Sequence, residues 1–257
     1  MTLVWRPGFQ FDADASTYIE AVEAADTQAL ETGVRYAIND FVIGCKNDGI
    51  WDAIKASCIL AGARTLAGAL VPLVGTAPTN YNFVSGDYDR ETGLVGDAST
   101  KYLDSNRNNN ADPQDSKHLT VYAITGNGTS NALIGTGLLS DSGNSFILQV
   151  AIPRAKLNSG GDSSFSGVGR WTTGFIGINR SDSSSFQYRD NGTSETVSNT
   201  SVSLFDGTIR VFARGGVTPS SFYDGRIAFY SIGESLDLAA LDTRVSALIT
   251  AIGAAIP

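Results

Sequence analysis

The pattern of hydrophobic and polar positions divides the chain into three parts, of which the first is helical. Its apolar residues recur at the three- and four-residue spacing of one helix face. They include Leu30, Val34, Ala37, Ile38 and Phe41. Gly33 predicts a break between two helices, because glycine is a poor helix former. We therefore expect an N-terminal helical segment over residues 1–63, with a further short helix at Gly49–Ser57.

The second part, from Leu66 to about Gly233, is rich in glycine and proline, and its apolar residues alternate with other residues. Alternation is clear in Phe146–Ile152 and in Ile209–Ala213. A period of two residues places successive side chains on opposite faces of a strand, so the pattern predicts many short β-strands.

One pair of these strands carries a specific turn. Asn191 and Gly192 lie between two strand-like runs, Phe186–Arg189 and Thr193–Ser198. Asn-Gly supplies the positive φ angles of a type I′ turn, which matches the twist of a two-stranded hairpin. The sequence therefore predicts a β-hairpin here.

The third part, Leu236–Ile256, returns to a helical pattern after Ser235, a candidate N-cap. Its apolar residues are spaced alternately by three and four positions, which places them in one stripe. The stripe consists of Leu238, Leu241, Val245, Leu248 and Ile252. Two interpretations stay open: the stripe packs on the rest of its own chain, or it joins copies into an oligomer.

Composition agrees with a mainly β protein, since 42% of the residues are hydrophobic and only 17% are charged. We expect a β-sandwich over residues 64–257 that ends in a helix from about residue 235. The formal net charge of -8 would repel a phosphate backbone, so nucleic acid is not an expected partner. No run reaches the roughly 18 apolar residues of a spanning helix, so we expect no membrane insertion. Cys45 and Cys58 are expected to be buried thiols.

The residues that carry catalysis in common hydrolases are sparse. His118 is the single histidine, no Gly-x-Ser-x-Gly motif occurs, and no glutamate begins the Glu-x-Asp-x-x-Glu pattern of sandwich glucanases. His118 precedes the alternating run Leu119–Thr125, so we interpret it as a residue at the edge of a strand. We therefore expect no enzymatic activity, and a glycan hydrolase is the minor alternative.

One segment has the spacing of a calcium site. Oxygen-bearing side chains occupy positions 1, 3, 5, 7, 9 and 12 of a stretch, as in an EF-hand loop. They are Asp104, Asn106, Asn108, Asn110, Asp112 and Asp115. Asn109 stands where an EF-hand has glycine, and position 12 has aspartate in place of glutamate. The alternatives are a calcium site, which would be the chain's one cofactor, and a solvated Asn-rich loop.

Three segments, Leu60–Leu73, Gly86–Leu94 and Gly96–Asp104, resemble virion structural and tail-fibre proteins of cyanophages and other marine bacteriophages. The resemblance extends from about Tyr18 to the end of the chain. It implies a structural protein located in the virion, assembled in the host cytoplasm, whose partners are other virion proteins.

A second resemblance is to laminin-G and concanavalin-A-like domains, which are jelly-roll β-sandwiches. It is carried by Gly96–Leu103, by the strand Lys117–Thr125, and by Tyr223–Ile232 before an acidic helix. The chain departs from these domains by about 60 extra helical residues at its front, and the lectin metal and sugar ligands cannot be matched one by one. The resemblance implies the sandwich more directly than any sugar specificity.

Two functions fit these expectations. The first is an adhesin module of a tail fibre or spike that binds a host surface glycan, as a homo-oligomer such as a trimer. Trp171, Tyr188 and Asn191 are its candidate ligand-binding residues, because aromatic rings and amides suit sugars. The second is a capsid decoration or other particle-assembly component that is held by protein contacts only, with the front helices as a docking arm.

Overall fold

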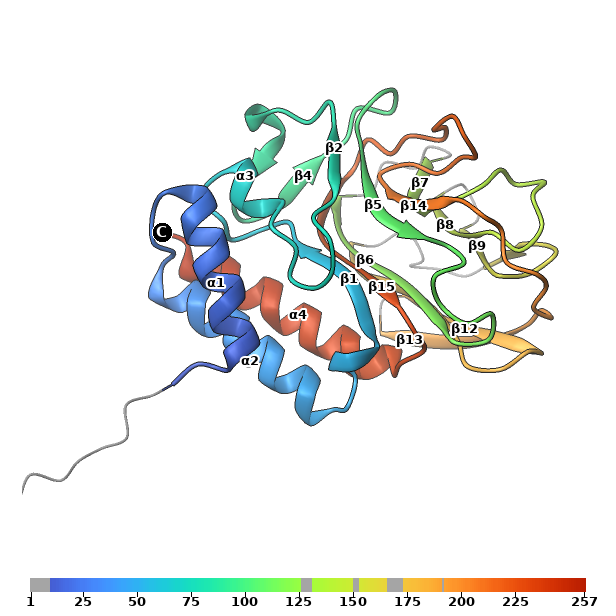
Figure 1. The fold of residues 1–257 in the computed structure, drawn as a ribbon, viewed down its shortest axis with the longest axis horizontal. Helices are drawn as coiled ribbons and strands as arrows, with labels where there is room; N and C mark the ends of the chain where they lie inside the picture. Colours follow the sequence, from blue (N-terminus) through green and yellow to red (C-terminus); the bar gives the residue numbers. More distant parts are fainter. Residues whose placement is uncertain (1–9, 126–130, 150–152, 166–172, 191) are drawn as a thin grey trace, which may run out of the picture.

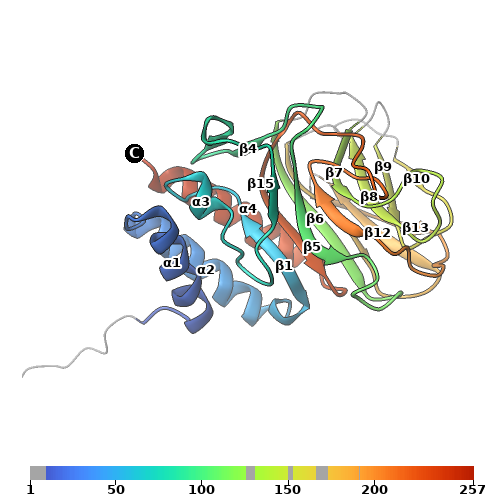
Figure 2. The same cartoon turned by 45° about the horizontal axis from the view of Figure 1, so that its top comes forward.

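The computed structural model describes residues 10–125, 131–149, 153–165, 173–190 and 192–257. Two antiparallel β-sheets pack face to face, and helices cover the outer face of one of them (Figures 1 and 2). The predicted mainly β sandwich with N-terminal helices and a C-terminal helix is therefore confirmed.

Sheet A has eight strands in the described part of the chain, in the order β13-β12-β11-β6-β15-β4-β3, with β1 also paired to β15. Its strands are β1 (Ile54–Ile59), β3 (Tyr88–Asp89), β4 (Gly93–Val95), β6 (Lys117–Thr125), β11 (Gly174–Arg180), β12 (Ser185–Asp190), β13 (Thr193–Ser198) and β15 (Arg226–Gly233). Central strand β6 pairs with both β11 and β15, so segments more than a hundred residues apart in sequence meet there.

Sheet B has seven strands among the described residues, in the order β10-β9-β8-β7-β14-β5-β2. They are β2 (Thr79–Tyr81), β5 (Tyr102–Asn108), β7 (Asn131–Gly135), β8 (Ser145–Gln149), β9 (Arg154–Leu157), β10 (Ser163–Ser164) and β14 (Thr208–Val211). Alternate residues of both sheets, such as Leu119, Ile178 and Ile209, are fully buried between them. Burial of these side chains is the main term that holds the two sheets together.

The helices are α1 (Ala13–Asp26), α2 (Thr32–Asn47), the short α3 (Leu66–Ala69) and α4 (Leu238–Ala255), with the 3-10 turns η1 (Trp51–Ala53) and η2 (Ser85–Asp87). Side chains from α1, α2 and α4 form a second core against the outer face of sheet A. Phe41 of α2 and Phe229 of β15 meet edge to face there, with ring centres 5.7 Å apart. The front helices are thus packed on their own chain.

The glycine expected to interrupt the front helices lies inside one of them, and this prediction is wrong. Gly33 belongs to α2, while the break falls between Asp26 and Thr32. A Cβ atom on Gly33 would lie 2.7 Å from the Cβ of Ala255. Gly33 therefore does not end a helix; it allows the close approach of α2 to α4, because a larger side chain would not fit there.

The expected helix at Gly49–Ser57 is also wrong beyond Ala53. Residues Ile54–Ile59 form strand β1, which pairs antiparallel with β15. The expected boundary after residue 63 therefore does not coincide with a break in the structure, because β1 precedes it and belongs to sheet A. Both cysteines are buried free thiols, as expected, and burial raises the pKa of each to about 12.

The apolar stripe of α4 is buried within its own chain. Leu238, Leu241, Val245, Leu248 and Ile252 are each 2% exposed or less, and all belong to the core formed with α1, α2 and sheet A. The interpretation of this stripe as an oligomer contact is wrong, and packing on the same chain is correct. Helix α4 is long and apolar enough to cross a membrane by length and composition alone, and its apolar stripe packs in the core with α1, α2 and sheet A.

The predicted hairpin is confirmed. Strands β12 and β13 pair antiparallel with Asp190 opposite Thr193, which leaves a two-residue connection. Gly192 has φ +75°, the left-handed region that the turn requires. Asn191 lies outside the described residues.

Candidate functional site

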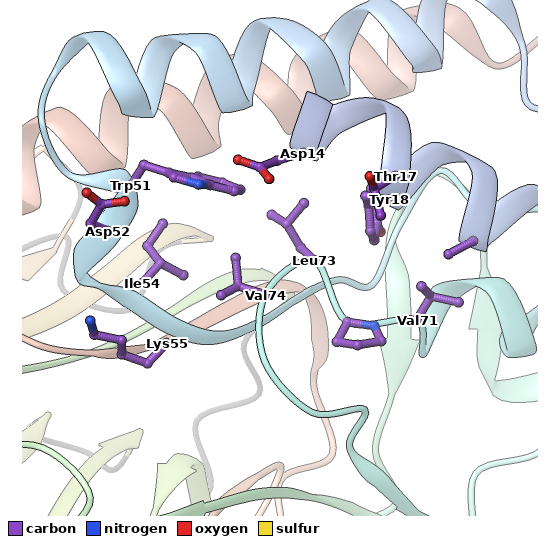
Figure 3. Close-up of a pocket in the computed structure, with 12 residues that line it drawn as sticks. Asp14, Thr17, Tyr18, Trp51, Asp52, Ile54, Lys55, Val71, Leu73 and Val74 are labelled. Carbon is purple, nitrogen blue, oxygen red and sulfur yellow. The ribbon is translucent and has the colours of Figure 1, made fainter. Parts of the chain in front are cut away.

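A cleft opens where helix α1 crosses the beginning of strand β1. It has a volume of about 520 Å³ and is lined by one side of α1, by residues 51–55 and by residues 71–74. Its walls include Ile54, Leu73 and Val74; Figure 3 shows Ile54 and Val74 below the indole ring of Trp51, and Leu73 below Asp14. The cleft therefore combines an apolar lining with an aromatic ring at one end.

Trp51 is positioned by the turn that ends α2. Helix α2 stops at Asn47, and Gly49 adopts φ +70°, which lets the amide of Ile50 donate to the carbonyl of Cys45 at 3.0 Å. Asp48 accepts two hydrogen bonds from the guanidinium of Arg244, at 2.7 and 2.9 Å, and this ties the turn to α4. The next residues form η1, whose first residue is Trp51.

Lys46 lies over the Trp51 ring and pairs with two aspartates. The Lys46 Nζ atom lies 5.8 Å from the ring centre and donates to Asp12 Oδ1 at 2.7 Å. It also lies 2.7 Å from Asp14 Oδ2, on the first turn of α1. These hydrogen bonds raise the pKa of Lys46 and lower the pKa of Asp12. The ammonium therefore stays charged and the carboxylate ionised over the ordinary pH range.

Trp51 separates two hollows. Beside the cleft lies a second depression of about 360 Å³, lined by Asp14, Lys46, Gly49, Trp51 and Asp52. Trp51, Asp14 and Asp52 line both hollows. Asp14 and Asp52 are exposed, while the ring of Trp51 is partly exposed. A ligand that spans the two hollows would contact the Trp51 ring and would have the carboxylates of Asp14 and Asp52 as hydrogen-bond acceptors.

The cleft has the properties of a small-molecule site. Such sites typically enclose about 300–1,000 Å³, with apolar walls and a few polar groups that fix orientation. An indole face offers a large flat surface of low conformational entropy. Carboxylates accept hydrogen bonds from hydroxyl groups, and the Lys55 ammonium, 3.1 Å from Glu234 Oε1, can donate them.

Of the three residues expected to bind sugar, one is described, and it lies in the core. Tyr188 is 2% exposed on β12, and its ring stacks on Phe165 with centres 3.8 Å apart. Its interpretation as a loop-side platform is wrong, because β12 turns this side chain between the sheets. Trp171 and Asn191 lie outside the described residues.

The expected EF-hand arrangement is not formed. Residues 102–108 are the extended strand β5, so Asp104, Asn106 and Asn108 follow one another along it. The strand bulges between Asp104 and Asn108, where Asn106 has φ +55° and four residue steps of β5 lie opposite two steps of β14. Asn110 donates to Asp206, and Asp112 pairs with Arg107. Asp115, the sixth residue of the set, has an unpartnered buried Oδ1 atom. The side chains of Asn110 and Asp112 are thus engaged within the chain, and calcium binding by this segment stays a prediction.

His118 is the second residue of β6, as the strand-edge interpretation expects, but its strand is central and its side chain is fully buried. Its Nδ1 atom lies 2.6 Å from the Glu234 carbonyl oxygen, so it carries the proton and donates. Nε2, 2.7 Å from Ser231 Oγ, is then the acceptor. Both nitrogens are engaged. No group of three or more His, Cys, Asp or Glu side chains among the described residues is arranged to hold a metal.

Sequence reasoning missed Trp51 and the two aspartates beside it. The Asn-Asp-Gly sequence of residues 47–49 ends helix α2, and Trp51 follows it after one intervening residue, Ile50. A tryptophan close after the end of a helix and next to an aspartate is a sequence signal for an exposed aromatic residue. Its neighbour Asp14 lies 37 positions earlier in the chain, a proximity that only the fold creates.

Comparisons with known proteins bear on the fold. No protein-family model matches the sequence, and no curated protein does. A solved structure concerned with the cell entry of botulinum neurotoxin type C, which depends upon interaction with two ganglioside molecules, aligns with a TM-score of 0.51 and 12% identity, over 79% of this chain and 52% of that chain. The botulinum neurotoxin serotype D binding domain aligns with a TM-score of 0.49 and 11% identity, over 75% of this chain and 50% of that one.

Domain 4 of an extracellular arabinanase from Geobacillus stearothermophilus, solved in complex with arabinotriose, aligns with a TM-score of 0.40 and 11% identity, over 66% of this chain and 82% of that one. The present chain spans about half the length of the two neurotoxin chains. At such low identity, the likeness to the type C neurotoxin structure shows a shared β-sandwich fold alone.

Proposed function

We propose that this chain is a non-enzymatic glycan-binding module, and that a sugar ring lies on Trp51 in the cleft beside α1. The observation that carries the proposal is the partly exposed indole between the carboxylates of Asp14 and Asp52, in an apolar cleft of about 520 Å³. A pyranose ring has one face of C–H groups, which packs on an aromatic face, and a rim of hydroxyl groups.

The rim of the cleft matches those hydroxyl groups. Asp14 and Asp52 accept hydrogen bonds, whereas Lys46 and Lys55 donate them. Because the Lys46 ammonium is already held by Asp12 and Asp14, a sugar meets side chains that are largely preorganised. Preorganisation lowers the entropic cost of binding.

The dependence of the cell entry of botulinum neurotoxin type C upon interaction with two ganglioside molecules supports a sugar ligand for a sandwich of this fold. The absence of catalysis is supported by His118, whose buried ring has both nitrogens in hydrogen bonds within the protein. The resemblance of Leu60–Leu73 and Gly86–Leu94 to phage virion proteins supports a place in a virion. The proposed role is therefore that of an adhesin module of a tail fibre or spike.

The test is a glycan array probed with the purified chain and with Trp51→Ala, followed by affinity measurements on the glycans that bind. Tyr36→Ala is the matched control, because it removes an aromatic side chain that is 42% exposed and outside the cleft. We expect Trp51→Ala to lose binding and Tyr36→Ala to keep it. Binding to empty capsids, with no glycan bound, would instead support a decoration protein.

A further inference from the structure

A row of aromatic and cationic side chains crosses the outer face of sheet B. Tyr81 of β2 is paired in register with Tyr102 of β5, and their rings stack with centres 4.3 Å apart and planes 6° apart. The guanidinium of Arg210, on β14, lies 5.8 Å from the centre of the Tyr102 ring. Because Ile209 and Val211 point into the core between the sheets, Arg210 points to the opposite face.

Arg210 has no carboxylate partner among the described residues. Only 7% of the residue is exposed, its Nη1 atom donates to the Gly215 carbonyl oxygen at 2.8 Å, and its Nε atom has no partner. Asp104 is opposite Arg210 in register but accepts from the Thr208 hydroxyl at 2.9 Å instead. A buried guanidinium without a counter-charge is costly, and an anion that reaches it is favoured.

A second arginine of the same kind follows it. Arg214 is 6% exposed, donates to the Gly137 carbonyl oxygen at 2.9 Å, lies 5.6 Å from the centre of the Phe146 ring, and has an unpartnered Nε atom. Burial lowers the pKa of its guanidinium.

The open end of the row is suited to a sugar. Tyr81 is 40% exposed, and Phe222 lies on another side of Tyr102, with ring centres 6.1 Å apart. Thr79 and Asn106 are exposed next to these rings and hydrogen-bond to each other, so hydroxyl and amide groups border the aromatic surface. Aromatic surface and neutral polar groups therefore lie on the β2 side of Tyr102, and the Arg210 guanidinium lies against the Tyr102 ring from the neighbouring strand β14.

We propose that Tyr81, Tyr102 and Arg210 form a second saccharide site, which takes a carboxylate-bearing sugar. The sugar ring packs on the exposed tyrosine, and its carboxylate accepts charge-assisted hydrogen bonds from the Arg210 guanidinium. The inference rests on the proposed function, that the chain binds glycans, and it adds an acidic class of ligand at a site on the other sheet.

The test uses an array of matched pairs, in which sialylated or uronic-acid glycans are presented beside their neutral counterparts, followed by dissociation constants for the pairs that bind. The variants are Arg210→Gln, Tyr81→Ala and Trp51→Ala. Arg35→Gln is the control, because it removes one positive charge from a partly exposed ion pair with Glu23 on the helices. Near-ultraviolet circular dichroism checks that each variant is folded.

We expect the wild-type chain to prefer the acidic glycan of each pair. Arg210→Gln should lower the affinity for the acidic glycan by about tenfold or more, as the loss of a charge-assisted hydrogen bond does. Tyr81→Ala, at an exposed position of an edge strand, should weaken it as well, while Arg35→Gln should not. Equal binding of acidic and neutral members overturns the inference, as does an acid preference that survives in Arg210→Gln and Tyr81→Ala.

The variants separate the two proposals. If Trp51→Ala no longer binds the neutral glycans and Arg210→Gln keeps the preference for acidic glycans, the result supports the cleft and contradicts the second site. If acidic glycans depend on Arg210 and no glycan depends on Trp51, the second site stands and the cleft fails.

Discussion

The Lys46 ammonium lies 5.8 Å from the centre of the Trp51 ring. The same ammonium holds the carboxylates of Asp12 and Asp14, so one cation joins the end of α2, the start of α1 and the aromatic ring. A cation above a ring is attracted to its π face, which fixes the ring's orientation. The cleft is therefore shaped before any ligand arrives.

Replacement of Lys46 tests this relationship. Lys46→Gln should lower glycan affinity, because Trp51 and Asp14 lose their shared partner, yet it should cost less than about 1 kcal/mol of stability, as partly exposed ion pairs do. Titration calorimetry and urea unfolding measure the two effects. Arg35→Gln is a close control, since the Arg35 and Lys46 side chains are 35% and 33% exposed in their pairs. An equal loss of affinity in both variants would contradict the role assigned to Lys46.

His118 makes stability depend on pH. Burial lowers its pKa from 6.5 to about 4, so between these values the unfolded chain binds a proton that the folded chain does not. The contribution to the free energy of unfolding is complete above pH 6.5 and is lost as the pH falls toward 4. At about 1.4 kcal/mol per pH unit, unfolding at pH 5 should cost about 2 kcal/mol less than at pH 7.5.

The chain's single histidine makes the measurement direct. A nuclear magnetic resonance titration of the His118 ring reports its pKa without assignment ambiguity, and urea unfolding at the two pH values reports the stability. His118→Gln should remove most of this pH dependence above pH 5. A His118 pKa near 6.5 in the folded chain would contradict the account.

The apolar stripe of α4 should contribute to stability and not to association. Leu241 is fully buried, so Leu241→Ala should lower the free energy of unfolding by about 2–5 kcal/mol. Ile43→Ala, at a position that is 37% exposed on α2, should cost far less. Light scattering should give the same molar mass for both variants and wild type. Dissociation of an oligomer by Leu241→Ala, at unchanged stability, would restore the association hypothesis.

Asp112 should act as a counter-charge instead of a calcium ligand. Its side chain is fully buried against Arg107, and its charge also favours the buried Lys117 ammonium, whose pKa burial lowers to about 7. Asp112→Asn leaves the cations without compensation and should cost about 3–5 kcal/mol. Asp104→Asn, which loses a contact with a hydroxyl, should cost less.

Thermal melting with and without calcium separates the two roles of Asp112. The loss in Asp112→Asn should be the same in chelator and in millimolar calcium. A calcium-dependent rise in the melting temperature of the wild-type chain that Asp112→Asn abolishes would show that the calcium interpretation was correct, because a ligand stabilises only the state that binds it.

The elements that sequence could predict are those fixed by neighbours along the chain. The Asn-Gly turn sets the β12–β13 hairpin locally, and the stripe from Leu238 to Ile252 repeats on one helix face. Strand β1 was missed because its state depends on pairing with β15, far along the chain: the thiol of Cys58 lies 3.4 Å from the hydroxyl of Tyr230, 172 positions away.

The same distinction explains the candidate site. Oxygen donors at every second position from Asp104 suggested a calcium loop, but a period of two is also the period of a strand, which β5 is. The cleft requires Asp14, Trp51 and Leu73 to meet from three separate elements. No local pattern encodes such a meeting, so sequence could supply the aromatic residue without its partners.

The most direct measurement of the central claim follows the three tryptophan indoles by nuclear magnetic resonance while a glycan that binds on the array is added. The Trp51 signal is identified by its absence in Trp51→Phe. We expect this signal to shift in a saturable way, with the dissociation constant found by calorimetry. A glycan that saturates the chain while the Trp51 signal stays in place, or an array on which no glycan binds, would contradict the account.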